Sequence, residues 1–370
     1  MQNIKLMAMI VLLGNINVFA QSKTVMINSE ILGEERQVLV GLPDSYNYDA
    51  DTFKYPLLLL TDGEWHFDMV LRATKLLYQN GFPKIIVAAI VNTNRGRDLT
   101  PTNTEEIHES GGALKFHRFI SEELLKNLEE NYRISNHRTL MGHSLGGLFA
   151  AYSLTQDINV FDAIIAVTPT IRWDDFEILQ DFTPDFTDKL IQSNKTFFMG
   201  IGDEVGPERD GVLRLKELFE TAHVSRFTYK EYPDESHVTV PWKAYFDGIK
   251  TVFNPFLLPE EYNKEDFSKT MAYYQNVGSS FDYDQRVPQR ILFNRGYGAL
   301  ESDIITEAKE IFEYYKHAYP NVPIPYTVLG DINFDLKQYK ISKENYDMAH
   351  QLYPSDYLKE RIKTLEEILN

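Results

Sequence analysis

The chain has 370 residues, of which 43% are hydrophobic and 13% aromatic. This composition excludes a disordered chain, and the length is sufficient for one large domain and a smaller one. The formal net charge is −17 without a strongly basic block, so we expect neither nucleic acid nor an anionic membrane surface as a partner. The absence of cysteine excludes disulfides, thiolate metal sites and a cysteine nucleophile.

Residues 1–20, MQNIKLMAMIVLLGNINVFA, combine a lysine, an apolar stretch from Leu6 to Leu13, and small or apolar residues that end at Ala20. This pattern is typical of a secretory signal peptide, and its apolar run is too short for a membrane-spanning helix. We expect cleavage after Ala20 and a periplasmic or secreted mature chain that has no membrane span. The alternative interpretation is an N-terminal core helix.

Strand and helix patterns alternate along residues 21–255. Residues 24–31 and 37–42 predict two antiparallel strands, and the apolar runs 55–61 and 84–91 predict strands that are covered on both faces. Further strands are expected at 138–141, 161–168, 195–201 and 227–232, and helices at 66–78, 113–131, 145–154 and 240–253. Such alternation predicts an α/β fold, with a mainly parallel sheet and helices on both faces.

The sequence around Ser144 predicts a catalytic nucleophile. Gly142-His143-Ser144-Leu145-Gly146 joins a predicted strand to a predicted helix. A serine on such a sharp turn is strained, and the flanking glycines avoid collisions that side chains would cause. The turn also directs the backbone N–H of Leu145 towards a developing oxyanion at the start of the helix. The alternative is a glycine-rich turn with an idle serine.

An acid and a histidine follow later strands. Asp203 and Glu204 come after the strand at 195–201, and His237 comes after the last predicted strand and directly before a helix. Serine, acid and histidine in this order are typical of α/β-hydrolases, in which the histidine acts as the general base. We favour Glu204 as the acid that orients His237, while Asp203 remains open.

Residues 23–255 resemble the esterase family that includes esterase D and the enterochelin esterase-like periplasmic hydrolases. The motifs that carry the resemblance are SEILGEERQVLVGLP at 29–43, LLLLTDGEWHF at 58–67, NRGRDLTP at 94–101, GHSLGG at 142–147 and SHVTVPW at 236–242. The resemblance implies an α/β-hydrolase fold. It also implies a second oxyanion donor from the backbone N–H of Gly63 or Glu64. The position of the acid departs from many relatives, which leaves the choice between Asp203 and Glu204 open.

Four side chains are candidates for substrate binding. Arg95 and Arg97 lie in the predicted loop 92–112, where they could hold a polar or anionic substrate or else form salt bridges that brace the loop. Trp65 and Trp173 could line an aromatic pocket or belong to the core. The pattern requires no cofactor and no metal.

Residues 256–370 form a separate region that begins near Pro255 and Pro259 and is rich in tyrosine and helix-forming patterns. A period of 34 residues relates Gly296 to Gly330, Phe312 to Tyr346, Tyr319 to Tyr353 and Pro320 to Pro354. This period resembles tetratricopeptide helical pairs, with two copies and a last helix at 357–369. Two repeats bury little core alone, so we expect a structural or lid-like contribution; the alternative is docking of a protein partner.

The sequence therefore predicts three parts: a signal peptide at 1–20, an esterase domain at 21–255 and a helical extension at 256–370. Its function is predicted to be hydrolysis of small-molecule carboxylic esters through an acyl-enzyme on Ser144, with siderophore, acyl-sugar and feruloyl-type esters left open. The alternatives are a non-catalytic scaffold that docks a partner through the repeats, and an acyltransferase that uses the same residues.

Overall fold

The computed structural model describes residues 22–47 and 53–370, so the predicted signal peptide lies outside the described residues. The chain divides into two units. The sheet unit comprises the described residues up to Leu257 together with Val277–Asp284, and the helical unit comprises Leu258–Asn276 and Gln285–Asn370. The sequence analysis assigned all residues after 255 to the helical extension, whereas Val277–Asp284 cluster with the sheet unit in the structure.

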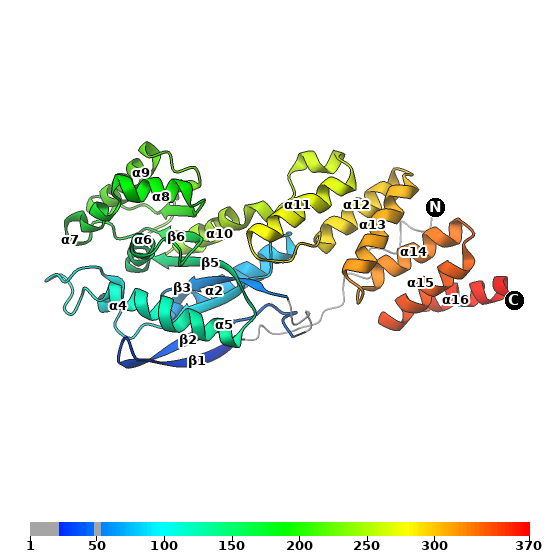
Figure 1. Ribbon diagram of the computed structural model, residues 1–370, viewed down its shortest axis with the longest axis horizontal. Coiled ribbons are helices and arrows are strands. Elements are labelled where there is room, and N and C mark those ends of the chain that lie inside the picture. Colours follow the sequence, from blue (N-terminus) through cyan, green and yellow to red (C-terminus); the bar gives the residue numbers. More distant parts are fainter. Residues whose placement is uncertain (1–21, 48–52) are drawn as a thin grey trace. The chain divides into compact units, whose positions relative to one another are not determined.

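The sheet unit is built on eight strands in the order β1-β2-β4-β3-β5-β6-β7-β8 (Figure 1). Their bounds are β1 (Ser22–Ser29), β2 (Glu34–Gly41), β3 (Tyr55–Leu60), β4 (Ile86–Ile90), β5 (Ile134–His143), β6 (Ala163–Val167), β7 (Thr196–Ile201) and β8 (Phe227–Glu231). β2 runs antiparallel to both of its neighbours, and every other pair is parallel. The predicted mainly parallel sheet is confirmed.

Helices cover both faces of this sheet (Figure 1). The helices between residues 63 and 256 are α2 (Gly63–Gln79), α3 (Arg95–Leu99), α4 (Ala113–Arg118), the π-helix η2 (Phe119–Leu124), α5 (Leu125–Asn131), α6 (Leu145–Gln156), α7 (Trp173–Phe176), the 3₁₀ turn η3 (Glu177–Asp181), α8 (Pro184–Gln192), α9 (Pro207–Thr221), α10 (Val240–Phe253) and the 3₁₀ turn η4 (Asn254–Phe256). α2 and α10 are in contact with each other and with the central strands. Because helices lie on both sides, β3, β4, β6 and β7 are buried at every position.

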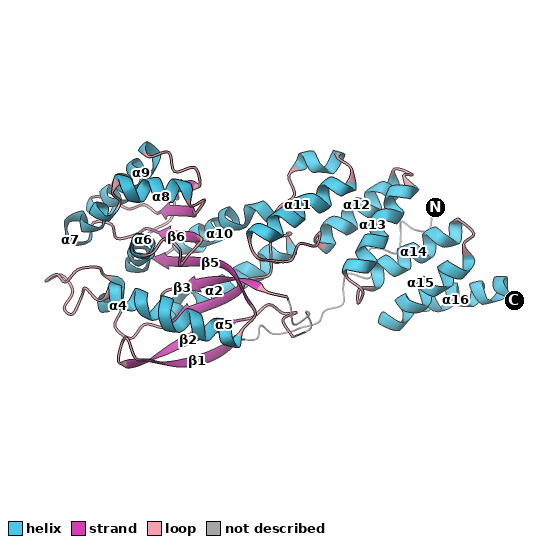
Figure 2. Ribbon diagram, viewed as in Figure 1, coloured by secondary structure: helices cyan, strands magenta, loops and turns pink. Residues whose placement is uncertain are grey.

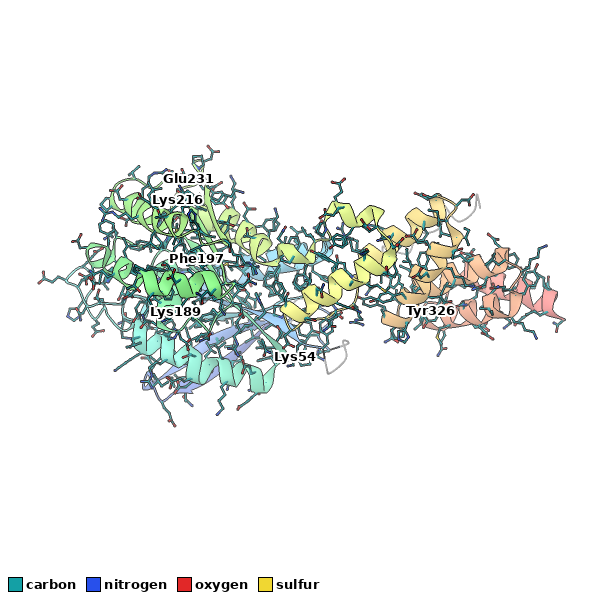
Figure 3. The ribbon with its side chains drawn as sticks, turned by 45° about the horizontal axis from the view of Figure 1, so that its top comes forward. Lys54, Lys189, Phe197, Lys216, Glu231 and Tyr326 are labelled. Atoms are coloured by element: carbon teal, nitrogen blue, oxygen red, sulfur yellow. The ribbon has the colours of Figure 1, made fainter. Side chains whose placement is uncertain are left out.

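The core of the sheet unit follows from the alternation of side chains along each strand. On β3, Leu57 and Leu59 join the cluster formed with α4, α5, α6 and α9. On the opposite face, Gly248 of α10 comes so close to β6 that an added Cβ would lie 2.6 Å from Ile165. Phe197 of β7 packs edge-on against Phe219 of α9, with ring centroids 4.9 Å apart (Figure 3).

One predicted helix, at 113–131, differs in detail from the structure. Its middle turn is the π-helix η2, which separates α4 from α5. A π-turn carries one extra residue and rotates the following side chains. Glu123, within η2, accepts hydrogen bonds from the backbone N–H groups of Glu30 and Ile31 at 3.0 and 3.1 Å. The irregular turn thus fixes the connection between β1 and β2.

The helical unit contains the 3₁₀ turn η5 (Glu260–Lys264) and the helices α11 (Phe267–Ser280), α12 (Gln289–Glu301), α13 (Ile305–Ala318), α14 (Pro323–Asp335), α15 (Tyr339–Leu352) and α16 (Asp356–Leu369), although the end of α11 belongs to the sheet unit. From residue 258 onwards the described chain has helices and loops only (Figure 2). The 34-residue period has a physical counterpart: added Cβ atoms at Gly296 and Gly330 would lie 2.7 and 2.5 Å from the rings of Phe312 and Tyr346. Each glycine allows one helix of a pair to approach the next.

The last three helices share a buried polar cluster. The hydroxyls of Tyr346 and Tyr357 both donate to Asp331, and Arg361 donates to the hydroxyl of Tyr346 at 2.9 Å. Tyr326, also on α14, packs at the edge of the nearby apolar cluster (Figure 3). None of the helices in the described part of the chain has the length and apolarity needed to cross a membrane.

Candidate active site

Ser144 occupies the turn between β5 and α6, at the carboxyl edge of the sheet. Its backbone has φ 58° and ψ −120°, which is a strained conformation for a residue with a side chain. Its N–H donates to the carbonyl of Val167 at 3.0 Å, and its carbonyl accepts from the N–H of Leu148 at 2.9 Å. The neighbouring strand and the first turn of α6 therefore hold the strained residue in place.

The two glycines around Ser144 are required by close contacts. An added Cβ at Gly142 would lie 2.2 Å from the carbonyl oxygen of Gly146, and one at Gly146 would lie 2.3 Å from the hydroxyl of Thr61. A side chain at Gly142 would collide with the backbone of Gly146, and one at Gly146 would collide with the side chains of Thr61 and Asp62. Thr61 directly follows β3, so these contacts show that the Ser144 turn packs closely against the end of β3.

The turn after β3 lies beside Ser144 because β3 and β5 are adjacent parallel strands. Asp62 adopts a left-handed conformation with φ 57°, and α2 starts at Gly63. The first amides of α2 that bond back to Asp62 are those of Trp65 and His66, at 3.1 and 3.2 Å. The N–H groups of Gly63 and Glu64 precede them at a helix N-terminus, where amides have no partner within the helix. The N–H of Leu145 occupies the equivalent position at the start of α6.

His237 and Glu204 are in contact. His237 Nδ1 lies 2.7 Å from Glu204 Oε1, although the two residues come from the loops after β8 and β7. Asp203 is directed differently: its side chain is exposed, and its N–H donates to the carbonyl of Glu235 at 2.8 Å. The structure thus places Glu204, and not Asp203, against the imidazole. With Nδ1 occupied by the carboxylate, Nε2 is left as the ring atom that can exchange a proton with a substrate or nucleophile.

A row of three rings, of which His143 and Tyr245 are buried and His66 is partly buried, continues from His237. The ring of His143 is 4.6 Å from that of His237, His66 is 5.9 Å from His143, and Tyr245 of α10 is 5.4 Å from His66 (centroid distances). Burial lowers the pKa of His143 to about 3, so this imidazole is neutral at physiological pH. A neutral ring in this position adds no positive charge beside His237. Sequence reasoning passed over His143, because the second residue of G-x-S-x-G varies without altering the motif.

Arg95 braces the site from the side. Its guanidinium bonds Asp62 at 2.6 and 3.1 Å and the carbonyl of His143 at 3.1 Å. It therefore ties the turn after β3 to the residue that precedes Ser144. Asn92 supports the same turn by donating to Asp62 at 2.7 Å. Of the two interpretations of Arg95, the structure matches the salt bridge.

Two residues predicted to bind substrate make contacts within the protein instead: Arg97 forms ion pairs, and Trp173 is buried. Arg97 is engaged by Glu34 at 2.6 Å and by Asp98 at 2.7 Å, which raises the pKa of its guanidinium. Trp173 is only 1% exposed, and its indole N–H donates to Thr102 at 3.0 Å. Arg97 is thus a loop brace and Trp173 a core residue. Of the two interpretations of Trp173, aromatic pocket or core, the structure matches the core, because a side chain this deeply buried offers no face to a ligand.

Thr170 is a neighbour of Ser144 that sequence reasoning missed. Its hydroxyl lies 3.4 Å from Ser144 Oγ, and its N–H donates to the carbonyl of Ser144 at 3.2 Å. Thr170 follows β6, which pairs with β5, so its place beside Ser144 depends on strand order. No local signal in the sequence distinguishes it from other threonines.

The arrangement brings together the parts that acyl transfer needs. The strained serine turn follows β5, a second turn with helix-start amides follows the neighbouring β3, and the Glu204–His237 pair follows β7 and β8, all at the carboxyl ends of parallel strands of one sheet. Among the described residues, no group of three or more histidine and carboxylate side chains is placed to hold a metal ion.

Two curated relatives each match about half of this chain. The ferri-bacillibactin esterase BesA of Bacillus subtilis is 27% identical over 216 residues, which cover 50% of this chain and 74% of that protein. A siderophore enterobactin esterase of Emericella nidulans is 34% identical over 214 residues, which cover 47% of this chain and 70% of that protein.

A solved structure and a family profile agree with these relatives. The crystal structure of an IroE-like serine hydrolase from Shewanella oneidensis superposes with a TM-score of 0.67 at 25% identity, covering 81% of this chain and 99% of that one. Its similarity confirms the predicted α/β-hydrolase fold. Residues 29–249 match the family described as "Putative esterase", which is more than half of the chain. The chain therefore belongs to this esterase family.

Proposed function

We propose that the protein is a serine carboxylic ester hydrolase in which Ser144 is the nucleophile, His237 the general base and Glu204 the acid that orients it. The observation that carries the proposal is the 2.7 Å contact between His237 Nδ1 and Glu204 Oε1, made from two strand ends of the sheet that also bears the strained Ser144 turn. Membership in an esterase family supports the same reaction class.

In the first half of the reaction, Ser144 Oγ attacks the ester carbonyl carbon while His237 Nε2 takes the hydroxyl proton. The carbonyl oxygen becomes an oxyanion, which the N–H groups of Leu145 and of Gly63 or Glu64 stabilise. Glu204 stabilises the imidazolium that forms. The intermediate then collapses: the bond to the alkoxy oxygen breaks, His237 gives its proton to that oxygen, and an alcohol leaves.

In the second half, a water molecule attacks the acyl-enzyme. His237 Nε2 removes a proton from the water, the same N–H groups hold the second oxyanion, and the bond to Ser144 Oγ breaks as His237 returns the proton to it. The products are a carboxylic acid and the free enzyme. No other group needs to supply or accept an electron or a proton.

For the physiological substrate we propose an ester bond of a siderophore. The two curated relatives, which act on ferri-bacillibactin and enterobactin according to their names, support this class. Acylated sugars and feruloyl esters are the other members of the panel to be tested.

We also propose that the protein is exported and that residues 1–20 are removed. The support is the pattern of one lysine, the apolar run and the terminal Ala20 in the sequence. N-terminal sequencing of the protein from the periplasm or culture medium should begin at Gln21. Recovery of the intact N-terminus only from the cytoplasm would contradict export.

Ester hydrolysis by wild type and Ser144→Ala tests the reaction. We expect wild type to cleave p-nitrophenyl acetate and trilactone siderophores, and Ser144→Ala to lose nearly all of this activity at an unchanged melting temperature. A fluorophosphonate should label one peptide, the one that contains Ser144, as read by mass spectrometry. Activity that survives in Ser144→Ala, or labelling elsewhere, would remove Ser144 from the mechanism. A wild type that is inactive on every ester would favour the scaffold alternative.

A further inference from the structure

Formal charge differs between the two edges of the sheet. We define the site edge as the connections after β3, β4, β6, β7 and β8, with α3, α7 and the first turns of α2, α4, α9 and α10: residues 61–66, 91–116, 168–176, 202–210 and 232–243. We define the amino edge as the connections before β3 to β8, with the last turns of α2, α5, α6, α8 and α9: residues 42–54, 76–85, 128–133, 153–162, 189–195 and 218–226. The site edge has 14 acidic and six basic side chains, and the amino edge eight and six. The formal charge is therefore −8 at the site edge and −2 at the amino edge.

Most basic side chains of the site edge already pair with carboxylates of the protein. Five of the six form such ion pairs, namely Arg95, Arg97, Arg172, Arg209 and Lys243, and the sixth is Lys115 on α4. An ion pair cancels charge locally. The acidic excess therefore belongs to exposed carboxylates that make no ion pair within the described residues, such as Glu105, Asp175, Asp210 and Asp234.

The segments of the site edge contact one another around the nucleophile turn. Arg172, after β6, bonds Glu106 of the loop after β4 at 2.8 Å and Glu208 of the first turn of α9 at 2.5 Å. Asn92, after β4, donates to Asp62, after β3, at 2.7 Å. The contact between the acid and the base joins the segments after β7 and β8. All five segments thus border one site, and their charges act together on an ester that approaches it.

Charge of one sign around a cleft produces a potential of several kT and concentrates substrates of opposite charge. The helix-start amides of the oxyanion turns supply positive potential, but this effect falls off within the first turn of a helix. They act on the reacting carbonyl and leave the more distant substituents of the ester to the carboxylates. The carboxylates form no site of their own; they set the potential in which the Ser144 site operates.

We propose that the active site selects esters by charge, favouring cationic over neutral and neutral over anionic substituents, through the acidic excess of the site edge; this inference rests on the proposed esterase function of the same site. The favoured class is an ester whose alcohol or acyl part carries an ammonium group. A carboxylate at the same position meets repulsion, because the arginines of the site edge are already bound to carboxylates of the protein.

The test uses two pairs of esters that differ in charge and little in shape. Acetylcholine and 3,3-dimethylbutyl acetate form the cationic pair, and 4-acetoxybutanoate and 4-acetoxybutanamide form the anionic pair. Full-length wild type is assayed near pH 8, where histidine is neutral, in about 0.01 M and about 1 M NaCl, at which the Debye length is about 30 Å and about 3 Å. Between these conditions, we expect the cationic-to-neutral ratio of kcat/KM to fall about tenfold and the anionic-to-neutral ratio to rise by a similar factor.

Two variants with four substitutions each locate the charge. The site-edge variant neutralises exposed carboxylates that make no ion pair in the described chain: Glu105→Gln, Asp175→Asn, Asp210→Asn and Asp234→Asn. It removes half of the net charge of −8, and because potentials of separate charges add, the tenfold salt effect should fall to about threefold. The matched control neutralises exposed, unpaired carboxylates on the segments that lead to the amino ends of β5 to β8: Glu130→Gln, Asp157→Asn, Asp188→Asn and Glu217→Gln.

The control variant should keep most of the tenfold effect. An equal loss in both variants would assign the effect to the net charge of the whole molecule and overturn the proposal. Hydrolysis of all four esters by wild type with ratios that salt does not change would also overturn it, and would leave the proposed esterase function intact.

Charged fluorescence quenchers give a readout that does not depend on turnover. All three tryptophans lie in the site edge, and Trp65 and Trp242 are 61% and 68% exposed. Relative to neutral acrylamide, caesium should quench wild type more strongly, and iodide more weakly, in about 0.01 M than in about 1 M salt. The site-edge variant should reduce both differences. If these results are obtained but wild type hydrolyses no ester, the proposed function fails while the charge of the site edge is upheld; quenching ratios that salt does not change would refute the charge inference.

Discussion

Replacing Glu204 with glutamine tests whether its contact with His237 serves catalysis. The carboxylate oxygen Oε1 accepts a hydrogen bond from Nδ1–H, with 2.7 Å between Oε1 and Nδ1. An amide at this position can turn its NH₂ group to Nδ1 instead and stabilise the wrong tautomer. Loss of the orienting acid costs about 10⁴ in kcat in a Ser-His-Asp triad. The His237 side chain is 40% exposed, so water can replace part of the interaction. We therefore expect kcat to fall by about 10³ to 10⁴, which corresponds to about 4 to 5.5 kcal/mol.

The assay is hydrolysis of p-nitrophenyl acetate at saturating substrate, with the melting temperature as a check on folding. Asp203→Asn is the matched control, because it makes the same change of charge at the adjacent position, where the side chain is exposed and the backbone N–H bonds Glu235. It should change kcat less than about threefold, by analogy with ordinary surface substitutions. A large loss in Asp203→Asn together with near-normal Glu204→Gln would refute the assignment.

Three further changes probe the framework. Gly146→Ala would place a Cβ 2.3 Å from Thr61 Oγ1. It should abolish fluorophosphonate labelling of Ser144 and lower the free energy of unfolding by about 1–3 kcal/mol. Full labelling of this variant would contradict the need for glycine at position 146. Phe281 is buried and packs on Phe256 with ring centroids 4.8 Å apart, so Phe281→Ala should lower the free energy of unfolding of the sheet unit by about 3–5 kcal/mol. For the same reason, a chain truncated at 256 should melt at a lower temperature than one truncated at 284. Equal melting temperatures of the two truncated chains would contradict a stabilising role of residues 277–284. Burial lowers the pKa of His137 to about 4, so between pH 6.5 and 4 the unfolded chain takes up a proton that the folded protein does not. This residue alone should lower the free energy of unfolding by up to about 1.4 kcal/mol for each pH unit that the pH falls in this range. His137→Phe should therefore reduce the slope of stability against pH by that amount in urea titrations, whereas an unchanged slope would exclude His137 as a source.

Most strands and helices follow from patterns of neighbouring residues, and for that reason they could be predicted from the sequence. Apolar runs such as 55–61 become strands that are buried on both faces, and glycine spacing around Ser144 defines the turn from β5 to α6. The order of serine, acid and histidine could be read without a structure because parallel strands end at one edge of a sheet, so residues after several strands converge there.

Pairings between distant segments could not be read in this way. Arg97 meets Glu34 across 63 positions, and Trp173 meets Thr102 across 71, so whether either side chain was free to bind a substrate depended on the folded chain. The return of Val277–Asp284 to the sheet unit is of the same kind: the Ser135 hydroxyl donates to the carbonyl of Phe281 at 3.1 Å, 146 positions away.

The choice of the acid that contacts His237 separates most clearly what the sequence determines from what the tertiary structure decides. By itself the sequence determined that a carboxylate follows β7 and a histidine follows β8, but Asp203 and Glu204 are adjacent and chemically alike. Only the tertiary structure decided which of them meets His237, because the N–H of Asp203 bonds the carbonyl of Glu235 and the side chain of the next residue then leaves the backbone towards the imidazole. The choice depends on the direction of one side chain, and the contact between the two loops after β7 and β8 fixes that direction.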